Sequence, residues 1–291
     1  PLRLVGSEMC IRDSTILHHI KLLRPLNVIT SGIAVLIATA ILEELDNVNI
    51  LLLTATIVML YTAASNSLND ALDHEIDLIN RPDRPIPSNN VSIQGALFLS
   101  LIFFSLGSTL CLQLTDMAKT VGIFIAIPIM IVYCTSLKGK YLVGNLAVAL
   151  VLGMTFLFVG VSHGNASPML VPMSLAFGLT LLREIVKDVS DIEGDQFSGL
   201  RTFPIVFGMN WSVRIIISLC VLIIFSAPIP YLKGAYGPGY IISLFIGVEL
   251  PLLVITFMFL KNPSISSATY SARILKFSTL MGLFSIYLGT L

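Results

Sequence analysis

Three aspartates that follow the apolar segment 50–68 are the residues most suited to chemistry. Asp70, Asp73 and Asp77 are spaced i, i+3 and i+7, so a continuing helix would place the three carboxylates on one face. Carboxylates this close repel one another, and too few Lys or Arg residues adjoin them to neutralise the charge. A hard divalent cation is the expected partner. We predict that these aspartates bind Mg²⁺ together with the phosphate oxygens of a substrate.

A second acidic cluster repeats the first. Asp188, Asp191 and Asp195 follow another apolar segment, each 118 residues after its counterpart in the first cluster. The constant offset suggests two related halves that face each other across one bundle. We therefore predict that metal ions bound by both clusters hold a diphosphate from two sides. The alternative is that each cluster is a solvated helix end outside a membrane.

Basic and polar side chains flank both clusters. Arg81 and Arg84 lie in the loop 80–88, which three prolines stiffen by fixing φ, and a guanidinium group suits phosphate oxygens. Arg183 and Lys187 are four residues apart, and so are the carboxylates Glu184 and Asp188, so basic and acidic side chains are interleaved at this helix end. The segment 133–140, at the end of the fourth expected span, offers two ammonium groups and a phenol.

Each set of basic residues also has a non-catalytic explanation. The arginines of the loop 80–88 could only set the membrane topology, and Lys138 and Lys140 could only extend toward the membrane interface. Arg183 and Lys187 could only form structural ion pairs along the helix. The predicted substrate-binding residues in the three segments are Arg81, Arg84, Tyr133, Lys138, Lys140, Arg183 and Lys187.

The composition shows which elements must position these residues. The chain of 291 residues is 55% hydrophobic and 12% charged, whereas soluble domains have about 25% charged residues. The mean hydropathy of +0.91 agrees, and the chain is predicted to be a polytopic membrane protein. Its formal net charge of zero gives no reason to expect nucleic acid as a partner. The four dispersed cysteines form no metal-binding or disulfide pattern.

We predict an all-α membrane bundle of about nine transmembrane helices. Thirteen Lys and Arg residues after residue 14 fall on the cytoplasmic side if the N-terminus is cytoplasmic, and only Lys119 and Lys233 fall outside. This topology places both acidic clusters on the cytoplasmic face of the cell membrane. The expected spans are 25–43, 50–70, 92–114, 119–138, 141–162, 168–188, 212–232, 239–260 and 272–290.

The domain organisation is expected to be simple. Residues 15–291 are predicted to form a single intramembrane domain, because no linker or low-complexity segment interrupts them. Residues 1–14 resemble a translated sequencing adapter and lack the apolar core of a signal peptide. We expect this segment to be non-native or unstructured.

The acidic and basic motifs together resemble those of the UbiA-type superfamily of intramembrane prenyltransferases. The family pattern Asn-Asp-x-x-Asp-x-x-x-Asp is present, and a proline- and arginine-containing segment follows it at 80–88. The second family motif matches at Asp191 and Asp195, with Asp188 one turn earlier. The resemblance implies a bundle whose central cavity opens to the cytoplasmic side and laterally to lipid. Mg²⁺ would hold a prenyl diphosphate there, and no obligate protein partner is expected.

The resemblance also assigns roles to residues. It adds Asn27, in the segment Leu23-Arg24-Pro25-x-Asn27, to the substrate-binding residues. The implied catalytic residues are Asp73, Asp77, Asp191 and Lys138. The implied metal ligands are Asn69, Asp70, Asp73, Asp77, Asp188, Asp191 and Asp195.

Within the superfamily, the segment 183–195 followed by Thr202-Phe203-Pro204 most resembles the archaeal digeranylgeranylglyceryl phosphate synthases. Those enzymes join a geranylgeranyl chain to geranylgeranylglyceryl phosphate. Ser190 stands where an acid is expected in that subgroup. Two alternatives stay open: prenylation of an aromatic acceptor of the quinone or chlorophyll type, and a cation-coupled transporter. A transporter would carry its acids near the bilayer midplane, rather than at cytoplasmic helix ends.

Overall fold

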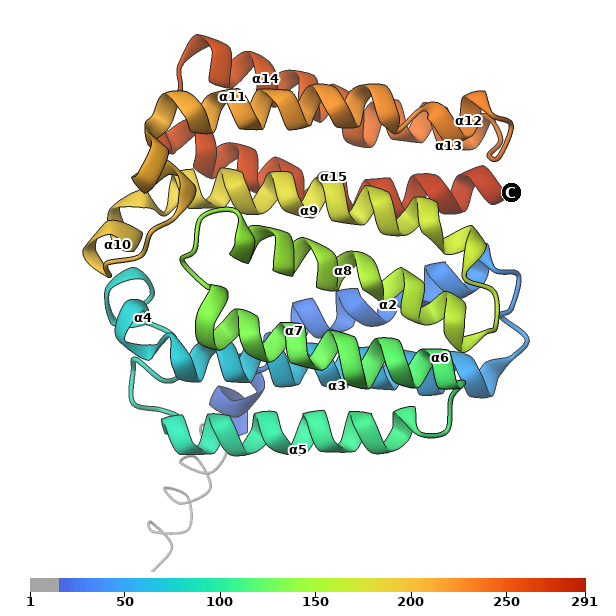
Figure 1. Cartoon of the computed structure of the whole chain (residues 1–291), viewed down its shortest axis with the longest axis horizontal. Helices are drawn as coiled ribbons and strands as arrows, with labels where there is room; N and C mark the ends of the chain where they lie inside the picture. Colours follow the sequence, from blue (N-terminus) through green and yellow to red (C-terminus); the bar gives the residue numbers. More distant parts are fainter. Residues whose placement is uncertain (1–15) are drawn as a thin grey trace, which may run out of the picture.

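The computed structural model describes residues 16–291, so the expectation for residues 1–14 lies outside the described part of the chain. The long helices run side by side as a bundle, and the described residues form no β-sheet (Figure 1). The all-α prediction is therefore confirmed. The main helices are α2 (Pro25–Ile41), α3 (Val48–Leu72), α4 (His74–Asn80), α5 (Ile93–Cys111), α6 (Asp116–Lys119), α7 (Ile127–Val132), α8 (Val143–Ser162), α9 (Leu170–Ser190), α10 (Ile192–Phe197), α11 (Phe203–Ser226), α12 (Ile229–Leu232), α13 (Pro238–Leu244), α14 (Leu250–Lys261) and α15 (Ile265–Thr290).

Several of these elements are single spans interrupted by wider or tighter turns. The π-helical segment η1 (Thr120–Ala126) connects α6 to α7, and η2 (Tyr133–Leu137) extends α7. A third π-helical segment, η4 (Phe245–Glu249), connects α13 to α14. The short 3₁₀ segment η3 (Ser167–Met169) leads into α9. Such π-helical turns are frequent at functional sites, and η2 leads directly to Lys138.

The apolar helices make the chain a multi-pass integral membrane protein. Among the described residues, seven helices are long and apolar enough to cross a membrane. The count rises to eight if Ile16–Leu22 and α2, which meet at a bend of 52°, form one span. The helix α15 packs against α9 and α13 and carries two basic residues, Arg273 and Lys276. The number of nine spans stays a prediction.

Both acidic clusters lie at the same end of the bundle. The first cluster covers the junction between α3 and α4, and the second covers the junction between α9 and α10. The short helices α4 and α10 contact each other at that end, on the left in Figure 1. The constant offset in the sequence therefore corresponds to two facing helix junctions.

The backbone of each cluster differs from the predicted continuing helix. The helix breaks at Asp73 and again at Asp191, where φ is −89° and −100°. Backbone hydrogen bonds nevertheless continue through the break, because the Asp77 amide donates to the Asp73 carbonyl at 2.8 Å. The Asp195 amide donates to the Asp191 carbonyl at 3.0 Å in the same way. Each break turns the chain while keeping the aspartates of one cluster on neighbouring turns.

Candidate active site

The first cluster is held by basic residues from outside its own segment. Asp70 forms an ion pair with Arg24, and it accepts a hydrogen bond from Arg84 Nη1 at 3.1 Å. Arg84 also pairs with Asp77, so one guanidinium group bridges two buried carboxylates. Arg84 thereby fastens the proline-containing loop onto the α3–α4 junction. This contact explains why an arginine is useful seven residues after Asp77.

Asp73 is held separately from its two neighbours. Its carboxylate is buried, forms an ion pair with Lys138 and accepts a hydrogen bond from Asn69 Nδ2 at 2.6 Å. The expectation that too few cations neutralise this cluster was wrong. Arg24 and Lys138 lie 46 and 65 residues away from their aspartates in the sequence, so proximity along the chain could not reveal them.

The second cluster has a different electrostatic environment. Asp188 accepts a hydrogen bond from Asn145 Nδ2 at 2.9 Å, and Asp191 accepts one from Ser190 Oγ at 3.0 Å. Within residues 16–291, none of the three aspartates has a Lys or Arg nitrogen within ion-pair distance. Desolvation raises the pKa of Asp195 to about 6, and the Asp191 carboxylate adds to this rise. These carboxylates are therefore the ones that lack a direct ion pair with a Lys or Arg of the described chain.

Two basic side chains lie between the clusters. The charge of Arg81 is within electrostatic reach of both Asp191 and Asp77. Lys138, which pairs with Asp73, also lowers the pKa of Asp195 by its positive charge. Both clusters therefore lie close enough to share basic residues. A diphosphate between them would meet carboxylate-bound metal ions and cations at once.

A backbone contact joins the segment after Lys138 to the loop that follows α10. The amide of Arg201 donates to the carbonyl of Gly139 at 3.0 Å, next to Lys138. Gly139 has φ of +75°, and a Cβ atom there would lie 2.7 Å from Leu200 Cδ2. Glycine is therefore required at this position both by the backbone conformation and by the close approach of the second loop.

Replacing Gly139 with alanine is expected to lower the melting temperature of the detergent-solubilised protein. The left-handed backbone disfavours a Cβ atom by about 1–2 kcal/mol, and the contact with Leu200 would displace Lys138 further. Gly199→Ala is the matched control, because Gly199 has φ of +69° but open space around its Cβ position. Equal melting temperatures for the two variants would contradict the role of the Leu200 contact.

Other predicted residues occupy a range of positions. Arg183 Nη1 donates to Glu184 Oε1 at 2.7 Å, and Lys187 Nζ lies 3.9 Å from Glu184 Oε2. Tyr133 at the start of η2 is within electrostatic reach of Glu184 and of one aspartate from each cluster, Asp73 and Asp188. Asn27 and Lys140 differ from these residues. Their side chains are exposed, and the described part of the chain gives neither of them an ion pair or side-chain hydrogen bond to the clusters.

Sequence reasoning missed three residues that contact the site. Arg24 has a left-handed backbone (φ 53°) directly before Pro25, and this conformation starts α2 beside Asp70. The sequence signal that could have identified Arg24 was its position in the segment Leu23-Arg24-Pro25. Asn145 of α8 donates a hydrogen bond to Asp188. Glu184 is buried and binds the two basic residues of α9.

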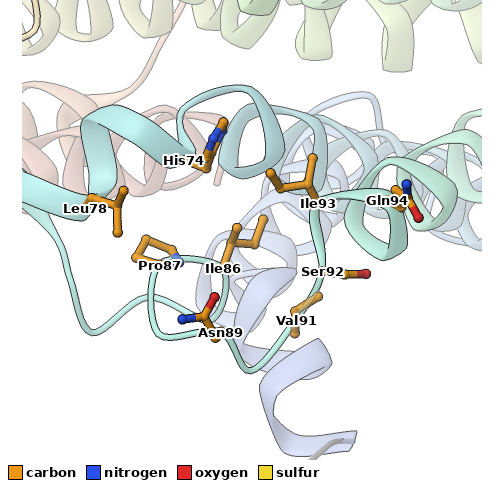
Figure 2. Close-up of a pocket in the computed structure, with 9 residues that line it drawn as sticks. All are labelled: His74, Leu78, Ile86, Pro87, Asn89, Val91, Ser92, Ile93 and Gln94. Carbon is orange, nitrogen blue, oxygen red and sulfur yellow. The ribbon is translucent and has the colours of Figure 1, made fainter.

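A pocket beside the first cluster lacks the charges of the site. It has a volume of about 400 Å³ and lies between α4, the proline-containing loop and the start of α5 (Figure 2). No Lys, Arg, Asp or Glu lines it, so it has no basic group to bind a diphosphate apart from the imidazole of His74. The predicted central cavity stays a prediction. The lining residues are His74, Leu78, Ile86, Pro87, Asn89, Val91, Ser92, Ile93 and Gln94.

The donor atoms present fit Mg²⁺ rather than a metal held entirely by protein. The described residues contain no group of three or more His, Cys, Asp or Glu side chains arranged around one point. Mg²⁺ does not need such a group, because it is usually held by one or two carboxylates, with waters and substrate phosphates completing the octahedron. Asp188, Asp191 and Asp195 could supply those carboxylates without displacing an internal cation.

The comparisons with known proteins agree with this arrangement. Residues 27–280 match the model of the UbiA prenyltransferase family. The chain belongs to this family. This membership makes the protein a prenyltransferase, confirms the resemblance drawn from the motifs and decides against the transporter alternative.

Two similar relatives of this UbiA family member carry the same name. A digeranylgeranylglyceryl phosphate synthase from Natronomonas pharaonis is 38% identical over 226 residues, which cover 77% of this chain and 81% of the relative. A synthase of the same name from Methanothermobacter thermautotrophicus is 34% identical over 258 residues, which cover 89% and 90% of the two chains. The chain therefore resembles enzymes of ether lipid synthesis over most of its length.

Solved structures show the same fold. A structure described in terms of digeranylgeranylglyceryl phosphate synthase in membranes has a TM-score of 0.79 at 29% identity, covering 95% of this chain and 98% of the other. A UbiA homologue from Archaeoglobus fulgidus bound to GPP and Mg²⁺ has a TM-score of 0.62 at 16% identity, with coverages of 92% and 99%. At that identity the second likeness supports the fold alone.

Proposed function

We propose that this UbiA family enzyme transfers a geranylgeranyl group from its diphosphate to geranylgeranylglyceryl phosphate, with Mg²⁺ as cofactor. The observation that carries the proposal is the pair of facing acidic clusters with Arg81 and Lys138 between them. Relatives at 38% and 34% identity are named for the product of this reaction, which supports the choice of acceptor. The A. fulgidus homologue bound to GPP and Mg²⁺ supports the choice of cofactor.

The proposed metal ligands are the oxygen donors of both clusters. When bound, Mg²⁺ would supply positive charge that stabilises the leaving diphosphate. The catalytic assignment of Asp73, Asp77, Asp191 and Lys138 is part of this proposal. The proposed ligands are Asn69, Asp70, Asp73, Asp77, Asp188, Asp191 and Asp195.

The chain's own basic residues would complete the donor site. Arg81 and Lys138 would bind diphosphate oxygens, because each already lies between carboxylates of the two clusters. The surrounding helices would exclude water while the allylic C–O bond breaks and diphosphate leaves. The acceptor hydroxyl, rather than water, would then form the new C–O bond to the prenyl carbon and lose its proton. We place this site on the cytoplasmic face of the cell membrane, within a single domain of residues 15–291.

Removal of divalent metal tests the proposal directly. Membranes containing the enzyme are incubated with labelled geranylgeranyl diphosphate and geranylgeranylglyceryl phosphate, first with EDTA and then with Mg²⁺. We expect no transfer in EDTA and full recovery with excess Mg²⁺, because the carboxylates and the diphosphate would otherwise repel one another. Undiminished transfer in EDTA would refute the metal role. Transfer only to aromatic acceptors in a parallel reaction would refute the proposed acceptor.

A further inference from the structure

A group of three charged residues on α9 carries more positive charge than its own partners neutralise. Glu184 is buried and accepts a hydrogen bond from Arg183 Nη1 at 2.7 Å. Lys187 Nζ lies 3.9 Å from the other carboxylate oxygen of Glu184. These are the only ion pairs of Arg183 and Lys187 within residues 16–291. One carboxylate thus faces two cations, and the group has a net charge of +1.

The guanidinium group of Arg183 also has an unused donor. Its Nε atom is buried and has no hydrogen-bond partner among the described residues. Buried donors of charged groups are normally satisfied, so a missing partner indicates a place for an acceptor from outside the chain. The remaining donors of a guanidinium group already bound by one carboxylate suit the oxygens of a phosphate.

The group lies next to the second acidic cluster. Lys187 lowers the pKa of Asp195 through its charge, so its ammonium group is near that carboxylate. Glu184 and Asp188 lie four residues apart on α9, which corresponds to about 6 Å along the helix. Arg183 lies five residues before Asp188, about 7.5 Å along the helix, so an anion bound there would lie beside the second cluster.

We infer that Arg183 and Lys187, positioned by Glu184, bind the phosphate monoester of the acceptor and select a phosphorylated lipid over its dephosphorylated form. The inference rests on the proposed function, in which Arg81 and Lys138 are assigned to the diphosphate of the donor. An acceptor without phosphate would leave the Arg183 Nε donor unpartnered and the net positive charge of the group unbalanced. Glu184 is a positioning residue in this scheme, because it holds both cations on one face of α9.

The test compares two acceptors in wild type and in Arg183→Lys. The acceptors are geranylgeranylglyceryl phosphate and geranylgeranylglycerol, which differ only in the phosphate. We expect the KM for the phosphorylated acceptor to rise at least about tenfold in the variant, because lysine keeps the charge but loses Nε and the planar fork. The KM for the donor should rise by a smaller factor, so the preference for the phosphorylated over the dephosphorylated acceptor should fall in the variant. Arg273→Lys is the matched control, because Arg273 is an exposed arginine on α15.

Failure of the inference differs from failure of the proposed function. If the wild type does not use the phosphorylated acceptor, the proposed function fails. If the wild type uses it and Arg183→Lys keeps the same preference between the two acceptors, the inference alone is overturned.

A second measurement does not depend on the variant folding. Glycerol 1-phosphate is added to the wild-type enzyme, with glycerol as the control. We expect glycerol 1-phosphate to raise the apparent KM of the acceptor and leave that of the donor unchanged. Competition with the donor alone would place the phosphate monoester in the diphosphate site and overturn the inference.

Discussion

Asp191→Asn is expected to reduce prenyl transfer at least about 100-fold, the usual effect of removing one group that stabilises charge in a transition state. Asp191 lies at the break between α9 and α10, where its carboxylate forms no direct ion pair within residues 16–291. Asparagine keeps the shape and the hydrogen bond from Ser190 but removes the charge that we propose to bind Mg²⁺. Transfer of labelled geranylgeranyl diphosphate in membranes measures the effect.

The control for this variant lies two residues further along the chain. Glu193→Gln removes an exposed carboxylate on α10 and should leave activity within a factor of about two, because exposed side chains away from a site rarely matter. Both proteins should be recovered from membranes in equal amount, since neither change affects an apolar helix. An Asp191→Asn enzyme that is fully active in Mg²⁺ would rule out Asp191 as a metal ligand.

Asp73→Ala should reduce the rate of prenyl transfer by a factor similar to that of Asp191→Asn.

Arg84→Met is expected to give the largest loss of stability in the absence of metal. Arg84 bridges Asp70 and Asp77, and all three side chains are largely buried. Its removal leaves the two neighbouring carboxylates, among the described residues, with Arg24 as the only direct ion-pair partner, which should destabilise the fold by about 3–5 kcal/mol. Thermal unfolding of the detergent-solubilised enzyme in EDTA measures the effect as a lower melting temperature.

Added Mg²⁺ should raise the melting temperature of Arg84→Met more than that of the wild type. The reason is that a divalent ion can replace the missing guanidinium between the two carboxylates. Lys119→Met is the matched control, because Lys119 forms a surface ion pair with the exposed Asp116 at 2.9 Å. Surface pairs contribute little, so this variant should unfold like the wild type with and without Mg²⁺. Equal responses of Arg84→Met and wild type to Mg²⁺ would show that no ion enters the first cluster.

The asymmetry between the two clusters explains why these variants should behave differently. In the first cluster, Arg24, Arg84 and Lys138 neutralise the aspartates, so a lost cation affects the fold. The second cluster lacks such partners in the described chain, so a lost carboxylate affects ligand binding instead. The two halves share the spacing of their aspartates but not their internal counterions.

The sequence alone determined the fold class and the acidic face of the site. Long apolar segments have no stable solution in a membrane other than helices, because every backbone polar group must be paired internally. The i, i+3, i+7 spacing of Asp70, Asp73 and Asp77 likewise forces the aspartates onto neighbouring turns, whatever the helices around them do. Local periodicity was therefore sufficient for these features.

Only the tertiary structure decided which cations meet these aspartates. Arg24 reaches Asp70 because of a left-handed residue at the start of α2, and Lys138 reaches Asp73 because η2 ends beside α3. Asn145 meets Asp188 only because α8 packs against α9. Such partners depend on how helices distant in sequence pack together. Spacing along the chain carries no information about that packing, and this is why the counterions of the site could not be predicted.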